Sequence, residues 1–252
     1  MNDIMQNKND TALSKRDYAE EFRNRVWFIK DMLSRSTAKG IVYGNSGGKD
    51  SALVGILCKA ACDDTVGVIM PSADQSFEQN TKDAYALAEA YGIETRYVDI
   101  TEVKASELRA LKNVVELSEV AEAHVAPRLR MTTLYAIAGS EKRIVAGTGN
   151  RSERFLGFFT KWGDGAYDFN PISDLTATEI YEFLAFLKAP DFIVNKAPST
   201  VKYDNETVEG GIKYSELDTY LLHGEVSEEA LEKIGRMHAK SQHKRDLSRT
   251  FS

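Results

Sequence analysis

Six consecutive residues, Ser46-Gly-Gly-Lys-Asp-Ser51, combine the chemical groups that bind phosphate. They follow a short apolar run that predicts a strand, Gly40–Gly44, and lead into a predicted helix. Glycines let the backbone turn its N–H groups toward a ligand, the helix N-terminus adds partial positive charge, and the serine hydroxyls add donors. The carboxylate of Asp50 suits such a site only if a cation lies between it and the phosphate, and Mg²⁺ prefers such oxygen ligands. The run predicts a phosphate cradle formed by Gly44, Ser46, Gly47, Gly48, Lys49, Asp50 and Ser51.

Two better-known phosphate-binding patterns are absent from this run. A Walker A loop needs glycine five positions before its last glycine, and serine or threonine after its lysine. Those two positions hold Tyr43 and Asp50 instead. The spacing also fails the G-x-G-x-x-G pattern of dinucleotide-binding folds. A glycine-rich turn between strand and helix, without a ligand, is the simplest alternative for this segment.

The elements expected around the cradle alternate between strands and helices. Strands are predicted over 40–44, 65–70, 95–100 and 143–146, and helices over 14–36, 50–62, 77–91, 102–122 and 125–139. This alternation predicts an α/β fold with a doubly wound open parallel sheet, Rossmann-like in its winding. Ligands of such sheets bind beyond the C-terminal ends of the strands, where the glycine-bearing loops 44–48 and 147–149 both lie.

The rest of the chain is expected to complete a single domain. Further helices are predicted over 178–187, 215–222 and 227–241, with an irregular stretch over 191–213. No linker divides the sequence, so we predict one domain over 14–252 with a helical C-terminal appendage, preceded by a loose tail over 1–13.

Composition narrows the class of protein. Hydrophobic residues make up 42% of the 252 residues, enough for a sizeable core, and the net charge of −6 disfavours nucleic acid as the main partner. No apolar stretch approaches the roughly 20 residues that span a bilayer, and the polar N-terminus does not look like a signal peptide. We therefore expect a cytoplasmic protein without a membrane partner. Cys58 and Cys62, four residues apart in an apolar helix, are interpreted as buried thiols.

The cradle resembles the SGGxDS signature of the ATP-pyrophosphatase, or PP-loop, enzymes, which split ATP into AMP and pyrophosphate and adenylate their substrate. Residues 144–172 distinguish among these enzymes, because they are similar to the NAD⁺ synthetase pattern GTxNxSE followed by GxxTKxGDGxxDxxPI. Shorter matches are RxRM at 128–131, KxPS at 196–199, GxxY at 211–214 and HKR at 243–245. The resemblance covers about residues 20–246. It implies an ammonia-dependent ligase that converts ATP, deamido-NAD⁺ and ammonia into AMP, pyrophosphate and NAD⁺.

The resemblance also implies roles for individual residues. Gln75, Thr148 and Ser199 would contact ATP beside the cradle, and Asp50 and Glu153 would be the protein ligands of Mg²⁺. The nicotinic acid dinucleotide would be held by Arg128, Lys161, Asp164, Asp168, Glu209, His243 and Lys244. Members of the family are homodimers, with some of these residues reaching across the interface. At this length we expect no glutaminase domain, so ammonia would come from solution or from another protein.

The residue types suit such a ligase. A substrate carboxylate and ATP repel each other, so adenylation needs cations, and Lys49, Lys161 and Lys244 are candidates beside Mg²⁺. Ammonia then displaces AMP and must lose a proton, which Asp164 or Asp168 could accept. Asp50, Lys161, Asp164 and Asp168 are therefore the candidate catalytic residues. Simpler alternatives stay open: Glu153 could only cap a helix, Asp164 could only form a turn, and 243–245 could be a solvated basic end.

Three departures from the family pattern leave other functions open. Ala177 stands where relatives usually carry a phosphate-binding lysine, a charge that Lys49 could supply instead. His124 replaces an expected asparagine and, without a visible partner, is interpreted as a surface or packing residue. The segment between Pro198 and Gly211 is short and lacks the usual acidic run. The alternatives are a ligase for a different carboxylic acid and a nucleotide-binding module without catalysis.

Overall fold

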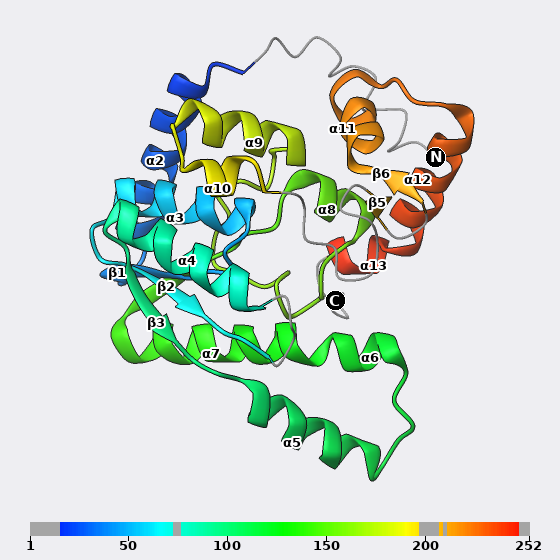
Figure 1. Ribbon diagram of the computed structural model, residues 1–252, viewed down its shortest axis with the longest axis horizontal. Coiled ribbons are helices and arrows are strands. Elements are labelled where there is room, and N and C mark those ends of the chain that lie inside the picture. Colours follow the sequence, from blue (N-terminus) through cyan, green and yellow to red (C-terminus); the bar gives the residue numbers. More distant parts are fainter. Residues whose placement is uncertain (1–15, 73–76, 197–206, 209–210, 247–252) are drawn as a thin grey trace, which may run out of the picture.

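A central parallel sheet organises the computed structural model (Figure 1). The structure describes residues 16–72, 77–196, 207–208 and 211–246. The strands of this sheet are β1 (Gly40–Gly44), β2 (Thr65–Ile69), β3 (Glu94–Tyr97) and β4 (Arg143–Ala146). Their order is β3-β2-β1-β4, with Val42 of β1 opposite Val66 on one side and Val145 on the other. β2 is buried along its whole length, as expected for a parallel strand that is covered on both faces.

Helices cover both faces of the sheet (Figure 1). One face packs on α2 (Tyr18–Ser34), α3 (Lys49–Ala61), α4 (Phe77–Tyr91) and α9 (Ala177–Phe186), and the other on α7 (Val125–Glu141). Side chains alternate along β1, so Ile41 and Tyr43 join the first core while Val42 joins the second. The doubly wound α/β fold predicted from the sequence is confirmed.

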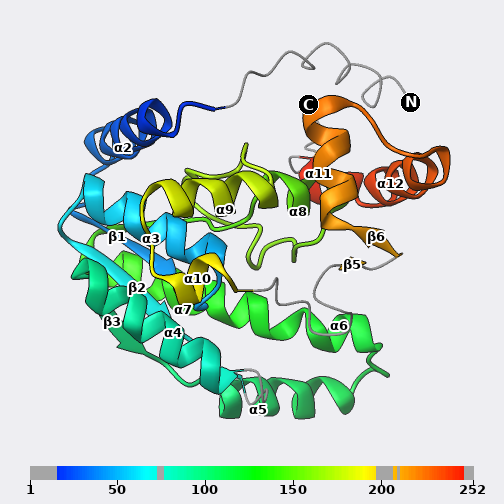
Figure 2. The ribbon, with the colours of Figure 1, turned by 45° about the horizontal axis from the view of Figure 1, so that its top comes forward.

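The C-terminal part forms a smaller unit with its own apolar cluster. It contains α8 (Arg151–Leu156), α11 (Tyr214–His223), α12 (Glu228–Lys240), α13 (Gln242–Arg245) and the antiparallel pair β5 (Thr207–Val208) and β6 (Ile212–Lys213). Leu156, Leu217, Tyr220 and Ile234 are the centre of its core. Figures 1 and 2 both show α11 and α12 side by side at one end of the molecule. The appendage is therefore helical, as predicted, with a short two-stranded ladder added.

Some predicted elements differ from those observed. The helix expected over 102–122 is two helices, α5 (Thr101–Lys112) and α6 (Glu119–Ala123), because the side chain of Ser118 caps a new N-terminus by accepting from Ala121 N. The strand expected to reach residue 100 ends at Tyr97, since Asp99 instead accepts from Thr101 N at 2.8 Å. The stretch expected to be irregular includes a helical turn, α10 (Asp191–Val194).

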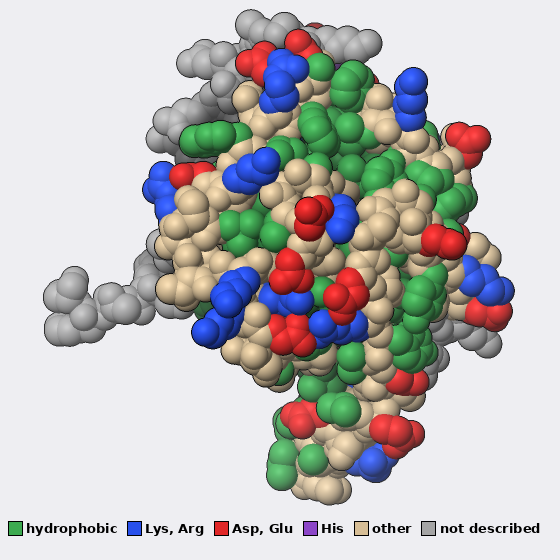
Figure 3. All heavy atoms as spheres, turned by 90° about the vertical axis from the view of Figure 1, so that its left-hand side faces the viewer, with side chains coloured by type: hydrophobic (Ala, Val, Ile, Leu, Met, Phe, Trp, Pro, Cys, Tyr) green, Lys and Arg blue, Asp and Glu red, His purple; other side chains and the backbone are tan. Residues whose placement is uncertain are grey.

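The side of the molecule where the strands begin carries both acidic and basic side chains, and several of them form ion pairs. Figure 3, which looks at the left-hand side of Figure 1, shows acidic and basic side chains intermixed there. Arg143 pairs with Asp64 and Glu141, and Arg96 pairs with Glu94 and Glu141. Exposed pairs of this kind contribute little individually to stability. Across the described residues, no helix has both the length and the apolar character needed to cross a membrane.

Candidate active site

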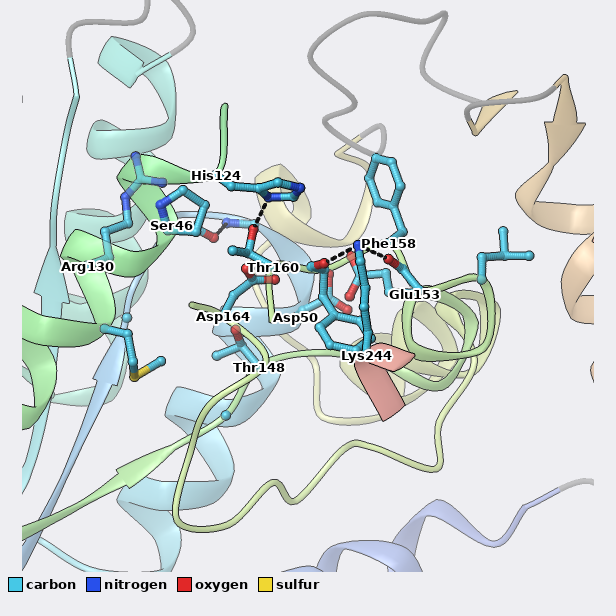
Figure 4. A pocket seen from close by; sticks show the side chains of 18 of the residues that line it. Ser46, Asp50, His124, Arg130, Thr148, Glu153, Phe158, Thr160, Asp164 and Lys244 are labelled. Carbon is cyan, nitrogen blue, oxygen red and sulfur yellow. Dashed lines mark hydrogen bonds between the residues drawn. The ribbon is translucent and has the colours of Figure 1, made fainter. Parts of the chain in front are cut away.

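The two glycine-bearing loops meet where the winding of the sheet reverses. β1 and β4 are neighbours in the sheet although β2 and β3 separate them along the chain, so the segments that follow β1 and β4 diverge around a crevice. Asn150 Nδ2 donates to Asp50 Oδ1 at 2.9 Å, which joins the two loops directly. A cavity of about 1140 Å³ opens there (Figure 4). This volume exceeds the roughly 300–1,000 Å³ of common small-molecule pockets, so there is room for more than one ligand.

The backbone of the first loop is bent by Gly47, whose φ is +72°. A Cβ at this position would lie 2.0 Å from the carbonyl oxygen of Asn80, so both the conformation and the space require glycine. Ser51 Oγ donates to Gly48 O at 3.0 Å and lies 3.1 Å from Ser46 Oγ. Among the described residues, no side chain makes a capping bond at the start of α3, which begins at Lys49, so its N-terminal N–H groups remain suited to an anion.

Lys49 is buried within the cradle, with its side chain beside a carboxylate. Its Nζ lies 2.6 Å from Asp50 Oδ2 and 5.6 Å from the ring centroid of Tyr181. Burial disfavours the charged amine, but the negative charges of Asp50 and Glu153 outweigh that effect and raise the pKa of Lys49. The cradle therefore holds a fixed positive charge of its own.

Glu153 both caps a helix and lines the cavity. Asn150 Oδ1 accepts from Glu153 N at 2.9 Å, and Glu153 Oε2 accepts from Asn150 N at 3.1 Å, a reciprocal capping box at the start of α8. Desolvation and, next, the negative charge of Asp50 raise the pKa of Glu153 to about 8. The capping role that the sequence left open is present, and it orients the carboxylate of Glu153 toward that of Asp50.

Asp50 and Glu153 form a donor set that fits a hard divalent cation. Two carboxylates that disfavour each other's ionisation gain from a cation between them, and Mg²⁺ commonly takes one or two protein carboxylates plus phosphate oxygens. No cluster of three or more acidic, histidine or cysteine ligands occurs in the part of the chain that the structure describes. The pair is thus typical of a cation shared with a substrate.

The start of α9 is fixed next to the cradle by a buried carboxylate. Asp218 on α11 accepts from Ser152 Oγ at 2.5 Å and from Thr178 N and Oγ1 at 2.8 and 2.7 Å. Ser152 Oγ in turn accepts from Ala177 N at 3.1 Å. Ala177 and Tyr181, one helical turn apart, both line the cavity. The ammonium of Lys49, 5.6 Å from the Tyr181 ring centroid, therefore lies beside the helix that carries Ala177.

The far wall of the cavity consists of residues 157–164 and α13. Lys244 Nζ donates to Gly157 O and Phe159 O, both at 2.7 Å. Asp164 Oδ1 accepts from Thr160 N at 2.9 Å, and desolvation by the surrounding protein raises the pKa of the Asp164 carboxyl although the residue keeps access to the cavity. Figure 4 shows Asp50, Glu153 and Asp164, from three different segments, gathered around one space.

His124 requires a correction to the sequence interpretation. The residue was expected to be a surface or packing residue without a partner. The structure places it on the cavity wall at the junction of α6 and α7, with Nδ1 2.7 Å from Thr160 Oγ1. The sequence offered no signal for this contact, because 36 residues separate the two positions.

The cavity brings together many of the residues predicted from the sequence. Those that line it are Gly44, Ser46, Gly48, Lys49, Asp50, Thr148, Glu153, Asp164, His243 and Lys244. Gly47 and Ser51 lie within the cradle and shape its backbone without lining the cavity. Gln75, Ser199 and Glu209 fall outside the described residues, as does the tail over 1–13.

Three predicted substrate residues, Arg128, Lys161 and Asp168, are not among the residues that line the cavity. Asp168 accepts from Val145 N at 2.7 Å and from Tyr135 Oη at 3.0 Å. Lys161 Nζ donates to His243 O at 2.5 Å, and Arg128 Nε donates to Lys161 O at 3.3 Å. Lys161 thus contacts the backbone of α13, whereas Asp168 is held between β4 and α7.

Several lining residues had no role in the sequence prediction. Arg130 donates to Met70 O at 3.0 Å and to Ser72 Oγ at 2.9 Å, beside the end of β2. Lys196 donates to Gly47 O at 2.9 Å and pairs with Asp83, so it ties the cradle to α4. Both belong to short matched motifs, RxRM and KxPS, which were the available signals.

Fold and site together define a nucleotide-dependent α/β enzyme, with a glycine-rich phosphate cradle and a carboxylate pair at the switch point of the sheet. The NAD synthase family model matches residues 21–248. The NH₃-dependent NAD⁺ synthetase of Carboxydothermus hydrogenoformans is 40% identical over 236 residues, covering 92% of this chain and 96% of that protein.

Two solved structures have the same fold. An NMN synthetase from Francisella tularensis has a TM-score of 0.86 at 35% identity, covering 94% of this chain and 99% of that chain. The NH₃-dependent NAD synthetase of Campylobacter jejuni has a TM-score of 0.81 at 26% identity, covering 94% and 100%. The chain belongs to the NAD synthase family.

Proposed function

We propose that this chain is an ammonia-dependent NAD⁺ synthetase, a ligase that converts ATP, deamido-NAD⁺ and ammonia into AMP, pyrophosphate and NAD⁺. The observation that supports this most directly is the hydrogen bond from Asn150 to Asp50, because it brings the SGGKDS cradle and the GTGNRSE segment onto one cavity. Relatives that carry this activity by name cover nearly the whole chain.

In the first step, an oxygen of the substrate carboxylate attacks the α-phosphorus of ATP, and the bond to the β-phosphate oxygen breaks as pyrophosphate leaves. The open helix N-terminus and Ser46 bind the phosphates, and the ammonium of Lys49 offsets charge that accumulates on the leaving pyrophosphate. Lys196 holds the cradle against α4, which keeps the donors in place before ATP arrives. The cradle thus supplies positioning and electrostatic stabilisation.

Asp50 and Glu153 would hold Mg²⁺ at this site. When bound, the ion would offset the charge of the phosphates and of the substrate carboxylate. Asn150 positions both carboxylates, donating its amide to Asp50 and its backbone N–H to Glu153.

In the second step, ammonia attacks the acyl carbon of the adenylate, the bond to the AMP oxygen breaks, and the new amide nitrogen loses a proton. Asp164 lines the cavity, and Lys244 holds the same wall through the backbone carbonyls of Gly157 and Phe159. These residues bound the space in which the nicotinate ring would lie. Lys161 connects that wall to α13 through His243 O, and Arg128 donates to Lys161 O.

We also propose that two copies form a homodimer in the cytoplasm, with the sites near the interface, as the resemblance implies. Light scattering coupled to gel filtration tests the oligomeric state, and a monomer at micromolar concentration that retains full activity would contradict it.

A direct assay tests the proposed function. Purified protein is supplied with ATP, Mg²⁺, ammonium and deamido-NAD⁺, and AMP and NAD⁺ are measured together. Equal amounts of both, dependent on ammonium, are expected. A parallel reaction offers nicotinic acid mononucleotide, because one structural relative is an NMN synthetase. Turnover of the mononucleotide alone would replace the proposed substrate, and AMP release without an amide product would contradict the ligase.

A further inference from the structure

The two carboxylates of the candidate cation site belong to different parts of the molecule. Asp50 is on α3, in the helical layer that packs on the sheet, whereas Glu153 is on α8, in the C-terminal unit with its own apolar cluster. Both can bind one Mg²⁺ only if the two parts keep a fixed relative position, because its ligands must lie at about 2.0–2.1 Å. The contacts that join the two parts beside α8 therefore decide the geometry of the site.

A buried carboxylate on α11, that of Asp218, makes such contacts. Asp218 is only 2% exposed, and Ser152 on α8 is fully buried. One oxygen of Asp218 accepts from the hydroxyl of Ser152, and the other accepts from the backbone N–H and the hydroxyl of Thr178 on α9. Ser152 Oγ also accepts from the backbone N–H of Ala177, the first residue of α9. Figure 2 shows α8, α9 and α11 next to one another, so a single carboxylate connects three helices.

Asp218 is close to the cation site without being part of the cavity wall. It is not among the residues that line the cavity. Ser152, however, directly precedes Glu153 in the first turn of α8, so a contact that holds Ser152 also orients Glu153. Burial raises the pKa of Asp218, and the positive charge of Lys49 acts in the opposite direction, so the carboxylate lies within electrostatic range of the cradle.

The start of α8 has a second attachment that complements the first. Asn150, its N-cap, donates to Asp50 of the cradle, and the backbone N–H of Arg151 donates to Leu175 O at 2.7 Å. A short helix that is held only at its first residues could still turn about its axis. The contact between Ser152 and Asp218 removes that freedom, in the way that outer hydrogen bonds fix the ligands of metal sites.

We propose that Asp218 is a positioning residue of the cation site. By holding Ser152 against the start of α9, it sets the place of Glu153 relative to the carboxylate on α3. It would act through these neighbours and would not contact ATP or the ion itself. The inference rests on the cation site of the proposed function, and it assigns to α11 a part in metal binding although α11 supplies neither of the two carboxylates.

The test is the contribution of Mg²⁺ to ATP binding in Asp218→Asn. The one acceptor oxygen of the amide can serve both donors of Thr178, which leaves its NH₂ group facing Ser152, whose hydroxyl proton then loses its acceptor. Isothermal titration calorimetry measures ATP affinity with Mg²⁺ and in EDTA. With Mg²⁺ the affinity should fall about 10-fold, the lower end of the 10–100-fold typical of groups that orient metal ligands. In EDTA the variant should match wild type, because the cradle is unchanged.

Two variants in the same region serve as controls. Glu216→Gln removes a carboxylate from the same helix, and glutamine can still cap α11 at this position. Thr178→Val removes one bond to Asp218 but keeps the backbone donor of Thr178 and the bond from Ser152. Both should keep the full effect of Mg²⁺ on ATP affinity. A loss of that effect in either control as large as in Asp218→Asn would overturn the proposal.

Ser152→Ala is a second perturbation, which keeps the proposal testable if Asp218→Asn does not fold. It removes the hydroxyl that connects the carboxylate to α8 and leaves both bonds from Thr178 in place. The same loss of ATP affinity is expected with Mg²⁺, and no loss in EDTA. Wild-type affinity in Mg²⁺, or an equal loss in Mg²⁺ and in EDTA, would contradict a positioning role.

The assay for the amide product distinguishes this inference from the proposed function. A wild type that binds ATP more tightly with Mg²⁺, but forms no NAD⁺ from deamido-NAD⁺, would contradict the proposed function and leave the role of Asp218 to be decided by calorimetry. A wild type whose ATP affinity does not respond to Mg²⁺ would overturn the positioning role, because there would be no cation effect for Asp218 to support.

Discussion

The loops that follow β1 and β4 occupy equivalent places at the edge of the sheet but contribute in different ways. We propose that the loop after β1 binds phosphate mainly through its backbone, which Gly47 bends and Lys196 ties to α4. The segment after β4 would instead contribute side chains, and its Glu153 is oriented by a capping box. Backbone groups recognise phosphate in any nucleotide, whereas side chains can be exchanged to suit a particular carboxylic acid. In the proposed site, the first loop would therefore bind the phosphates, and the segment after β4 would complete the cation site.

The largest expected effect comes from Glu153, in the segment after β4. In Glu153→Gln the capping box survives, because glutamine also caps at this position, but one of two anionic ligands is lost. We expect kcat to fall by about 10³-fold, since a bound cation contributes several kcal/mol to a transition state of this kind. Steady-state AMP formation at varied Mg²⁺ measures it. Glu229→Gln, an exposed glutamate on α12, is the control, and a loss below tenfold would exclude a metal role for Glu153.

The same substitution should make the protein more stable when cations are removed. Because the pKa of Glu153 is raised to about 8 in the folded protein, the native state holds a proton that the unfolded state releases above its own, lower pKa. The cost of Glu153 to stability is absent at low pH and grows as the pH rises toward 8. Thermal unfolding in EDTA should thus show a Tm advantage for the variant that is negligible near pH 4 and clear at pH 8. A constant difference would contradict the raised pKa.

A smaller effect is expected from the charge held in the cradle. Lys49→Met keeps most of the buried volume but removes the ammonium beside Asp50. A charge-assisted hydrogen bond to phosphate is worth about 1.5–3 kcal/mol, so kcat/KM for ATP should fall about 10- to 100-fold. Adding Ala177→Lys should recover part of the loss, because Ala177 lines the same cavity. Unchanged ATP kinetics in Lys49→Met would show that Lys49 does not replace the charge missing at 177.

The smallest expected effect is a difference in stability between glycine substitutions in the loop after β1 and in the loop after β4. Gly47→Ala places a Cβ 2.0 Å from Asn80 O at a positive φ, so it should cost about 2 kcal/mol or more in the free energy of unfolding. Gly149→Ala meets no atom within 4 Å and should stay within about 0.5 kcal/mol of wild type. Urea unfolding of both variants measures the difference. Equal costs would mean that the first loop does not depend on its backbone in the way proposed.

The secondary-structure elements and the residues of the candidate site could largely be predicted from the amino-acid sequence. Apolar periodicity and glycine-bearing loops after strands predict the sheet, and motif spacing predicts Asp50, Glu153 and Lys244 as site residues, all of which line the cavity. These signals are local, because helix periodicity, caps and tight turns depend on residues a few positions apart. The same locality explains a failure: Ser118, a strong N-cap, divides a helix that apolar spacing alone extended to residue 122.

Which of these groups face one another depends on the order of the strands and the packing of the helices. Residues 50 and 150 meet because β4 pairs with β1, a neighbour in space but not in sequence. The contact between His124 and Thr160 requires α7 to cover one face of the sheet while residues 157–164 pass the C-terminal ends of its strands. The engagement of Asp168 with Val145 likewise follows from where the chain returns beside β4. Such contacts depend on strand order and helix packing, which are set by burial over the whole molecule and leave no local trace in the sequence.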